Sequence, residues 1–288
     1  MDVLTALIQG ILTGGLYTAT ALGLTLIFGV LRIVNLAHGE FVIAGGFLSL
    51  AITNAVGLDP LLTLPVVMAA GAAVGWALHR GLLGPLTRKG PTQPLVATFG
   101  LALLIQAAVA NAYGYNAQSL NAPYGDSGLD LLGVRVQTAY VIALGVAVVL
   151  TAITWYLVQR TRWGAAVRAA GRQPDVAALV GIDVRRLHAT VFALACALAV
   201  AGGVLVGVSA SFTPTSGAAY LVFGFTVVVL GGIGNVPGTL LAAMTLGVIQ
   251  SLTSLWLGGE YRDLAVYALF LALLAVRPQG LFTKVSTA

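Results

Sequence analysis

The sequence predicts an all-α polytopic membrane protein with about eight to ten transmembrane helices, some of them broken or glycine-rich. Three observations support this fold class. Of the 288 residues, 59% are hydrophobic and only 8% are charged, whereas a globular domain in water carries about 25% charged residues. Long uncharged runs recur along the whole chain, and the basic residues gather in the short segments between them. The chain is therefore expected to form a single transmembrane domain over residues 1–288.

The apolar runs predict helices, because the strands of a membrane β-barrel would alternate apolar and polar residues in segments of ~10. Two of the expected spans have uncertain ends. The run 3–31 is long and could divide at Gly14–Gly15, and the final stretch, LAVYALFLALLAV, is short for a span. The expected spans lie near 5–31, 41–57, 61–79, 94–112, 136–159, 187–209, 218–232, 238–257 and 264–277.

The distribution of charge predicts the orientation of these spans. With the N-terminus outside, twelve of the fourteen Lys and Arg fall in cytoplasmic segments beside three acids, and the outer segments keep two basic and six acidic residues. Basic residues favour the cytoplasmic side of a membrane. The chain is thus expected to place its basic segments and its C-terminus on the cytoplasmic side of the membrane. The net charge of +5 then reflects topology, and nucleic-acid binding is not needed to explain it.

Small residues and the single cysteine indicate how the helices pack. Gly10 with Gly14, and Gly71 with Gly75, have the spacing that lets two membrane helices approach closely, although chance in a chain with 36 Gly gives the same spacing. Cys196 lies in an apolar run and allows neither an intrachain disulfide nor a cysteine-based metal site. The N-terminal MDVLTALIQG lacks the basic start of a cleaved signal peptide, so the first span is expected to remain.

The segment 160–186 is too regular for a linker. Pro174 suits the first position of a helix, Asp175 suits its positive end, and Gly181 suits its C-terminal stop. A cytoplasmic helix of about two turns is therefore expected at 174–180, between two arginine-rich flanks. Such a helix fits docking onto a soluble partner, and it equally fits an interfacial helix held on anionic membrane lipid by its arginines.

The motif NLAHGE at 35–40 places a His and a Glu in an otherwise apolar region. It is a poor metal site, since positions i and i+2 do not share a helical face. A proton relay or an acid–base enzyme lacks further titratable groups within the spans. Two interpretations remain. One is a tight cytoplasmic connection in which Arg32 pairs with Glu40. The other is a helix broken at membrane depth, with Gly39 allowing close approach and Asn35 satisfying freed backbone groups.

Two further glycine-rich stretches resemble this one, namely ATFGL at 97–101 and LGGIGNVPG at 230–238. The second is dense in turn-forming residues and fits either a tight turn between helices or another break. It lacks the spacing of a dinucleotide-binding loop. Neither Lys89 nor Lys284 lies in a phosphate-binding GxxxxGK[ST] loop, so any ATP-driven step would need a separate chain.

Together, GLYTATALGLTLIFGVLRIVNLAHGEFVIAGGF, LVATFGLALLIQ, WGAAVRAAGRQPDVAALVGIDVRRLHATVF, VLGGIGNVPGTLLAA and RPQGLF resemble the permeases of branched-chain amino acid ABC transporters. The resemblance covers nearly the whole chain in order. It implies a non-catalytic permease subunit paired with a sister permease, two cytoplasmic ATPases that hold ATP and magnesium, and an extracytoplasmic solute-binding protein. It also implies a location in the inner (cytoplasmic) membrane of a bacterium, and no cofactor is expected in this chain.

The resemblance also implies roles for particular residues. The segment 172–183 would be the coupling helix received by an ATPase, and NLAHGE would be a broken element near the translocation path, with its polar side chains structural rather than chemical. The candidate coupling residues are Arg168, Arg172, Pro174, Asp175, Ala178, Leu179 and Gly181. The candidate translocation-path residues are Asn35, His38, Glu40, Thr98, Phe99, Gly100, Gly231, Gly232 and Asn235.

The sequence leaves alternatives for both the substrate and the source of energy for transport. The resembling family also includes permeases for urea, short amides and aromatic or dicarboxylic acids. Outside the family, a secondary carrier working alone would require more intramembrane acids, and a channel for a small neutral solute would require no motor. A membrane enzyme ranks last, because no catalytic constellation can be assembled from three scattered His and one Glu near the membrane.

Overall fold

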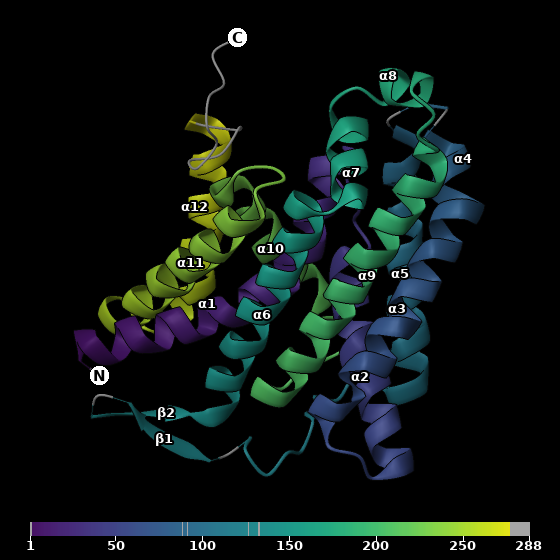
Figure 1. Ribbon diagram of the computed structural model, residues 1–288. Coiled ribbons are helices and arrows are strands. Elements are labelled where there is room, and N and C mark those ends of the chain that lie inside the picture. Colours follow the sequence, from purple (N-terminus) through teal and green to yellow (C-terminus); the bar gives the residue numbers. More distant parts are fainter. Residues whose placement is uncertain (1, 88, 91, 126, 132, 277–288) are drawn as a thin grey trace.

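The computed structural model describes residues 2–87, 89–90, 92–125, 127–131 and 133–276 as a helical bundle with one small hairpin (Figure 1). The helices are α1 Val3–Leu26, α2 His38–Val56, α3 Leu64–Leu78, α4 Gly84–Thr87, α5 Thr92–Tyr113, α6 Thr138–Arg160, α7 Arg162–Arg172, α8 Pro174–Leu179, α9 Val184–Ser209, α10 Gly217–Gly231, α11 Val236–Trp256 and α12 Arg262–Val276. The strands are β1 Gly128–Leu131 and β2 Val134–Gln137.

Within the described residues, seven helical segments are long and apolar enough to cross a membrane. Short π-helical and 3-10 turns prolong two of them, giving spans of Val3–Leu31 and Pro60–Thr87. The first long run is therefore one continuous helix and is not divided at Gly14–Gly15. The shorter helices α10 and α12 occupy the seventh and ninth predicted spans, so the predicted order and approximate bounds of the spans are confirmed.

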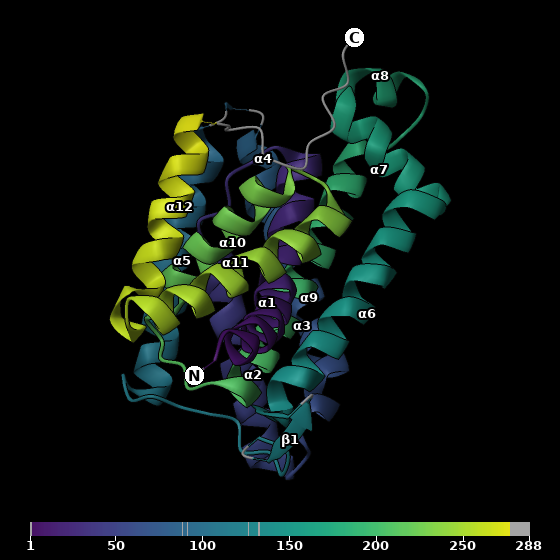
Figure 2. The same ribbon diagram turned by 90° about the vertical axis from the view of Figure 1, so that its left-hand side faces the viewer.

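Two helices form the centre of the bundle. Helix α1 packs against α6, α9, α10 and α11, and α9 packs against α1, α2 and α3. Every residue of α9 from Ala195 to Ser209 is buried. Figure 2 shows α9 behind α1, α10 and α11, with α6 and α12 at the sides of the view. The outer helices leave many large apolar side chains exposed, as expected for a surface in contact with lipid or with another membrane subunit.

The glycine pairs singled out from the sequence lie at helix contacts. A Cβ added to Gly10 or Gly14 would overlap the backbone of α11. A Cβ on Gly71 or Gly75 would overlap the side chain of Val200 or Cys196 of α9. Because a larger residue at these positions would push the helices apart, this spacing reflects close packing rather than chance.

The antiparallel hairpin β1–β2 was not predicted from the sequence. It lies in the connection between α5 and α6, at the end of the molecule opposite α8 (Figure 1). Val134 and Val136 point inward and cluster with Leu12 of α1, while Gly133 takes the turn with a φ of 79°. These two residues pack the hairpin against the bundle. In a sequence this apolar, two alternating buried residues are too few to predict a strand.

The two ends of the bundle differ in charge. The α8 end of the bundle carries the basic residues of the α3–α4, α7 and α8–α9 regions. The hairpin end carries Asp59, Asp130, Glu260 and Asp263, with Arg135 and Arg262 as its basic residues. Both views place the end of α12 at the same end as α8 (Figures 1 and 2). Of the predicted cytoplasmic basic residues, Arg88, Arg277 and Lys284 lie outside the described residues.

Candidate functional site

The NLAHGE motif begins a helix deep inside the bundle. Helix α1 continues through a π-helical turn to Leu31, and Arg32 then reverses the chain with a left-handed φ of 53°. Residues 32–37 run back along α1 until α2 starts at His38, whose Nε2 lies 2.8 Å from the carbonyl oxygen of Thr20. Thr20 precedes Leu31 by a rise of about 16 Å along a helix. The structure therefore supports the broken helix at membrane depth. It places Arg32, which is exposed, apart from the buried Glu40.

Polar side chains satisfy the backbone that this break leaves free. Asn35 Oδ1 accepts a hydrogen bond from the Ala37 amide at 3.1 Å, as expected from the sequence. Thr98 of α5 reaches across with its Oγ1, which accepts from the Leu36 amide at 3.2 Å. The His38 ring donates to a backbone carbonyl and is itself buried. Non-helical backbone persists at membrane depth only where neighbouring groups supply such partners.

Replacing Thr98 with valine should lower the thermal stability of the purified protein. Valine has nearly the same shape but leaves the partly buried Leu36 amide without its partner, at a cost of about 1 kcal/mol or more. Thr245→Val is the matched control, because Thr245 is exposed and bonds only to a carbonyl of its own helix. Thermal unfolding in detergent measures the difference. Equal midpoints for the two variants would contradict the role assigned to Thr98.

The start of α2 meets the start of α10. A Cβ added to Gly39 would overlap the carbonyl oxygen of Gly217, the first residue of α10. The Glu40 carboxylate lies against Gly217 as well, and its Oε2 has no hydrogen-bond partner among the described residues. A carboxylate is favoured beside helix N-termini, which carry partial positive charge. Two helices that start inside the bundle thus share one buried acid.

The chain enters these two helices from opposite ends. Residues 32–37 come from the end at α8, and residues 210–216 come from the hairpin end after α9 stops at Ser209. Gly203 of α9 lies so close to Val42 of α2 that no side chain would fit between them. The junction of α2 and α10 is consequently fixed by backbone contacts. Among the described residues, no group of three or more His, Cys, Asp or Glu could hold a metal ion.

The other predicted path residues lie elsewhere. Phe99 is 53% exposed on the outer face of α5, and Gly100 has no atom within 4 Å of where its Cβ would be. Of these three residues of the ATFGL stretch, Thr98 is the one that contacts the broken segment, through the Leu36 amide. The LGGIGNVPG stretch is a tight turn between α10 and α11, at the same end of the bundle as α8. Gly232 has a φ of 86°, Gly231 packs on Gly238, and Asn235 caps α11 by accepting from the Gly238 amide at 3.1 Å.

Glycines that sequence reasoning missed connect this turn to the rest of the site. A Cβ on Gly29, in the π-helical turn after α1, would lie 2.5 Å from the Cα of Gly234. On its other side, Gly171 of α7 approaches the Gly29 carbonyl oxygen. Helix α7, the end of the α1 span and the α10–α11 turn are therefore in backbone contact. The sequence alone could not single out these glycines, because they are three of 36.

The short helix predicted at 174–180 is present as α8, Pro174–Leu179. Pro174 is its first residue and Asp175 lies in its first turn. Gly181 follows the helix with a left-handed φ of 87°, in the stop position expected for it. Helix α7 precedes α8 and holds Arg168, whose guanidinium donates to the Val158 carbonyl oxygen of α6, and it ends at Arg172.

Helix α8 presents an apolar surface at its tip. Val176 is 52%, Leu179 86% and Val180 73% exposed, and Ala178 is exposed beside them. Ala177 is buried and anchors the helix against the bundle. A groove of about 670 Å³ adjoins the tip, between the α3–α4 region and the start of α9, and is lined by charged residues that include Arg80, Asp175, Asp183, Arg185 and Arg186. An apolar centre with a charged rim is the composition of a protein–protein contact.

Comparison with known proteins matches residues 6–274 to the family described as branched-chain amino acid transport system / permease component. The chain is 27% identical to the high-affinity branched-chain amino acid transport system permease protein LivH of Salmonella typhimurium, over 96% of this chain and 94% of that protein. It is 28% identical to BraD of Pseudomonas aeruginosa, a permease protein of the same description, over 96% and 95% of the two chains. Among solved structures, PsaBC from Streptococcus pneumoniae in complex with Fab aligns over 96% of this chain and 91% of that one, with a TM-score of 0.47 and 15% identity.

Proposed function

Because the chain belongs to the family of branched-chain amino acid transport permease components, we propose that it carries branched-chain or other hydrophobic amino acids through the membrane as part of an ATP-driven importer. It is the membrane-spanning, non-catalytic component of such a system. Uptake would proceed by alternating access, with the path opening to one side of the membrane at a time. ATP and magnesium would bind to partner ATPases and not to this chain.

The observation that carries this proposal is the exposed tip of α8. Leu179 and Val180 would insert into a groove on a cytoplasmic ATPase, with the neighbouring arginines of the rim steering the approach. Two such ATPases would drive one pair of permeases, formed by this chain and a sister permease. An extracytoplasmic solute-binding protein would deliver the substrate to the opposite face.

This proposal fixes the orientation of the chain in a bacterial inner membrane. The basic end at α8 would face the cytoplasm, and the hairpin end with its acids would face outward. The C-terminus would follow α12 to the cytoplasmic side. Membrane lipid would cover those outer apolar faces that the sister permease leaves free.

The contacts of α7 suggest how ATPase movement would reach the path. A push on α8 would move α7, which contacts the end of the α1 span through Gly171 and Gly29. That span leads directly into the broken segment with Asn35, His38 and Glu40. These side chains and Thr98 would hold the broken element in place, while Gly231, Gly232 and Asn235 would let the α10–α11 turn follow the movement.

Purification of the tagged chain from its native membrane in mild detergent should recover two ATPases and a second permease, identified by mass spectrometry. A carrier or channel working alone would come without them. The Leu179→Asp variant tests the contact itself. It places a charge at the apolar tip of α8 and should therefore lose the ATPases but keep the sister permease. Recovery of the wild-type chain alone, under conditions that preserve a known ABC complex, would contradict the proposal.

A further inference from the structure

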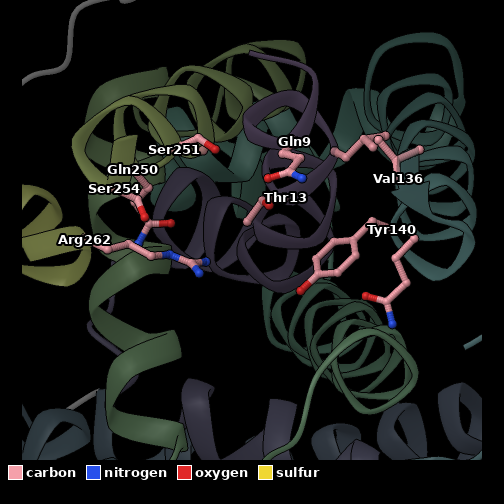
Figure 3. A pocket seen from close by; sticks show the side chains of 11 residues that line it. Gln9, Thr13, Val136, Tyr140, Gln250, Ser251, Ser254 and Arg262 are labelled. Atoms are coloured by element: carbon pink, nitrogen blue, oxygen red, sulfur yellow. The ribbon is translucent and has the colours of Figure 1, made fainter. Parts of the chain in front are cut away.

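A polar pocket lies between α1, β2, α6, α11 and the start of α12, at the hairpin end of the molecule (Figure 3). Its volume is about 310 Å³, near the lower end of the range for small-molecule sites. Most of the lining residues are polar in type, and Leu12 and Val136 are the apolar ones. The polar residues are Gln9, Thr13, Gln137, Tyr140, Gln250, Ser251, Ser254 and Arg262.

Arg262 supplies the positive charge of this pocket. It is the first residue of α12, and its guanidinium extends from that helix toward Thr13 and the facing Tyr140 hydroxyl (Figure 3). Its Nη2 donates a hydrogen bond of 3.2 Å to the hydroxyl of Tyr17, a neutral partner. Its other N–H groups remain for a further acceptor, because a guanidinium has five donors.

A network anchored on the buried side chains of Tyr17 and Gln250 holds the exposed Arg262 in this position. The Tyr17 hydroxyl donates to Gln250 Oε1 at 2.5 Å, and Gln250 Nε2 donates to Asp263 Oδ1 at 3.2 Å. The nearby carboxylate of Asp263 is thus engaged by an amide, and Asp263 is not among the residues that line the pocket. Asp263 attracts Arg262 electrostatically, but the hydrogen bond that positions the guanidinium goes to the neutral Tyr17 hydroxyl, which leaves donors preorganised for an incoming anion.

We propose that this pocket receives a free amino acid on the outer side of the membrane, with Arg262 binding its carboxylate. The inference rests on the proposed function, which supplies the class of substrate. The side-chain oxygens of Gln9, Gln137 and the serines are acceptors for the ammonium group. Leu12 and Val136 contact the aliphatic side chain. The pocket lies on the side where a binding protein would release its ligand.

Site-specific protection of a cysteine tests this proposal in the assembled transporter. Cys196→Ala removes the buried native thiol, and Ser251→Cys then places a single thiol in the pocket. The complex is placed in phosphatidylcholine nanodiscs and treated with N-ethylmaleimide. We expect leucine to slow labelling, and leucinamide, which has no carboxylate, to leave it unchanged. Ser119→Cys, exposed at the same end but outside this pocket, should react equally fast in every condition.

The charge of Arg262 is tested in the same background. Arg262→Gln should require about ten- to a hundredfold more leucine for equal protection, the effect of losing one charge-assisted contact. Arg262→Lys should recover part of the difference. Arg135→Gln, which removes an exposed arginine of the nearby hairpin, should leave protection unchanged.

The possible outcomes separate this inference from the proposed function. Absence of protection by leucine, equal protection by leucinamide, or an undiminished effect in Arg262→Gln would each overturn the inference. If labelling of the Ser251→Cys thiol were slow in phosphatidylglycerol nanodiscs without leucine, the anion bound by the pocket would be a lipid headgroup. That result would likewise overturn the inference. Leucine uptake by the wild-type complex with its binding protein is measured separately and decides the proposed function.

Discussion

The Gly181→Pro variant is expected to lose ATP-driven uptake entirely while still inserting into the membrane. Gly181 ends α8 with a φ of 87°, and its amide donates to the Ala178 carbonyl oxygen at 3.1 Å. Proline holds φ near −65° and has no amide hydrogen, so it can keep neither the turn nor the hydrogen bond. The exposed Leu179 would then point away from the surface that receives it. Uptake of labelled leucine into proteoliposomes measures the loss, and co-purification of the ATPases locates its cause.

Gly57→Pro provides the matched control for this variant. Gly57 ends α2 with a φ of 70°, its amide donates to Thr53 at 2.8 Å, and no atom lies within 4 Å of where its Cβ would be. The local damage is the same, but it occurs at the hairpin end. Gly57→Pro should therefore retain its ATPases. Gly181→Ala should be intermediate, because the left-handed conformation costs a residue with a Cβ about 1–2 kcal/mol. Normal uptake by Gly181→Pro would refute the assignment of α8 as the coupling helix.

The sequence was sufficient for features that depend on local chemistry. Apolar runs set the spans, so that the expected 187–209 corresponds to α9 Val184–Ser209. The caps of α8 were equally local, because Pro174 and Gly181 each favour one backbone conformation whatever surrounds them. The turn at LGGIGNVPG follows from the same logic, since Asn235 caps the helix that it begins.

The depth of the NLAHGE motif could not be predicted, because hydropathy measures transfer into the membrane and not position within it. The contacts that reveal the depth join residues far apart in sequence, such as His38 with Thr20 and Leu36 with Thr98. Neighbours in sequence can also be misleading on a helix. Thr98 and Phe99 share a motif but point to different faces of α5, as successive residues of a helix must.

The meeting of two helix starts predicts a strong effect for the smallest possible substitution. Gly39→Ala adds one methyl group where the Gly217 carbonyl oxygen already stands, and neither backbone can yield without moving α2 or α10. Overpacking of this kind costs about 1–3 kcal/mol, and more where the obstacle is backbone. We expect a lower unfolding midpoint in detergent, a reduced yield of folded protein and impaired uptake.

Gly100→Ala separates this effect from any general intolerance of larger residues in glycine-rich helices. Gly100 lies inside α5 with open space around it, and alanine favours a helix over glycine by about 1 kcal/mol. Its midpoint should be unchanged or higher. If Gly39→Ala were as stable as Gly100→Ala, the two helix starts could not be in backbone contact, and α2 would begin at some other depth. A lower midpoint for Gly39→Ala alone would tie the function of the NLAHGE motif to close packing, with Glu40 and His38 as supports of a broken helix rather than as chemical groups.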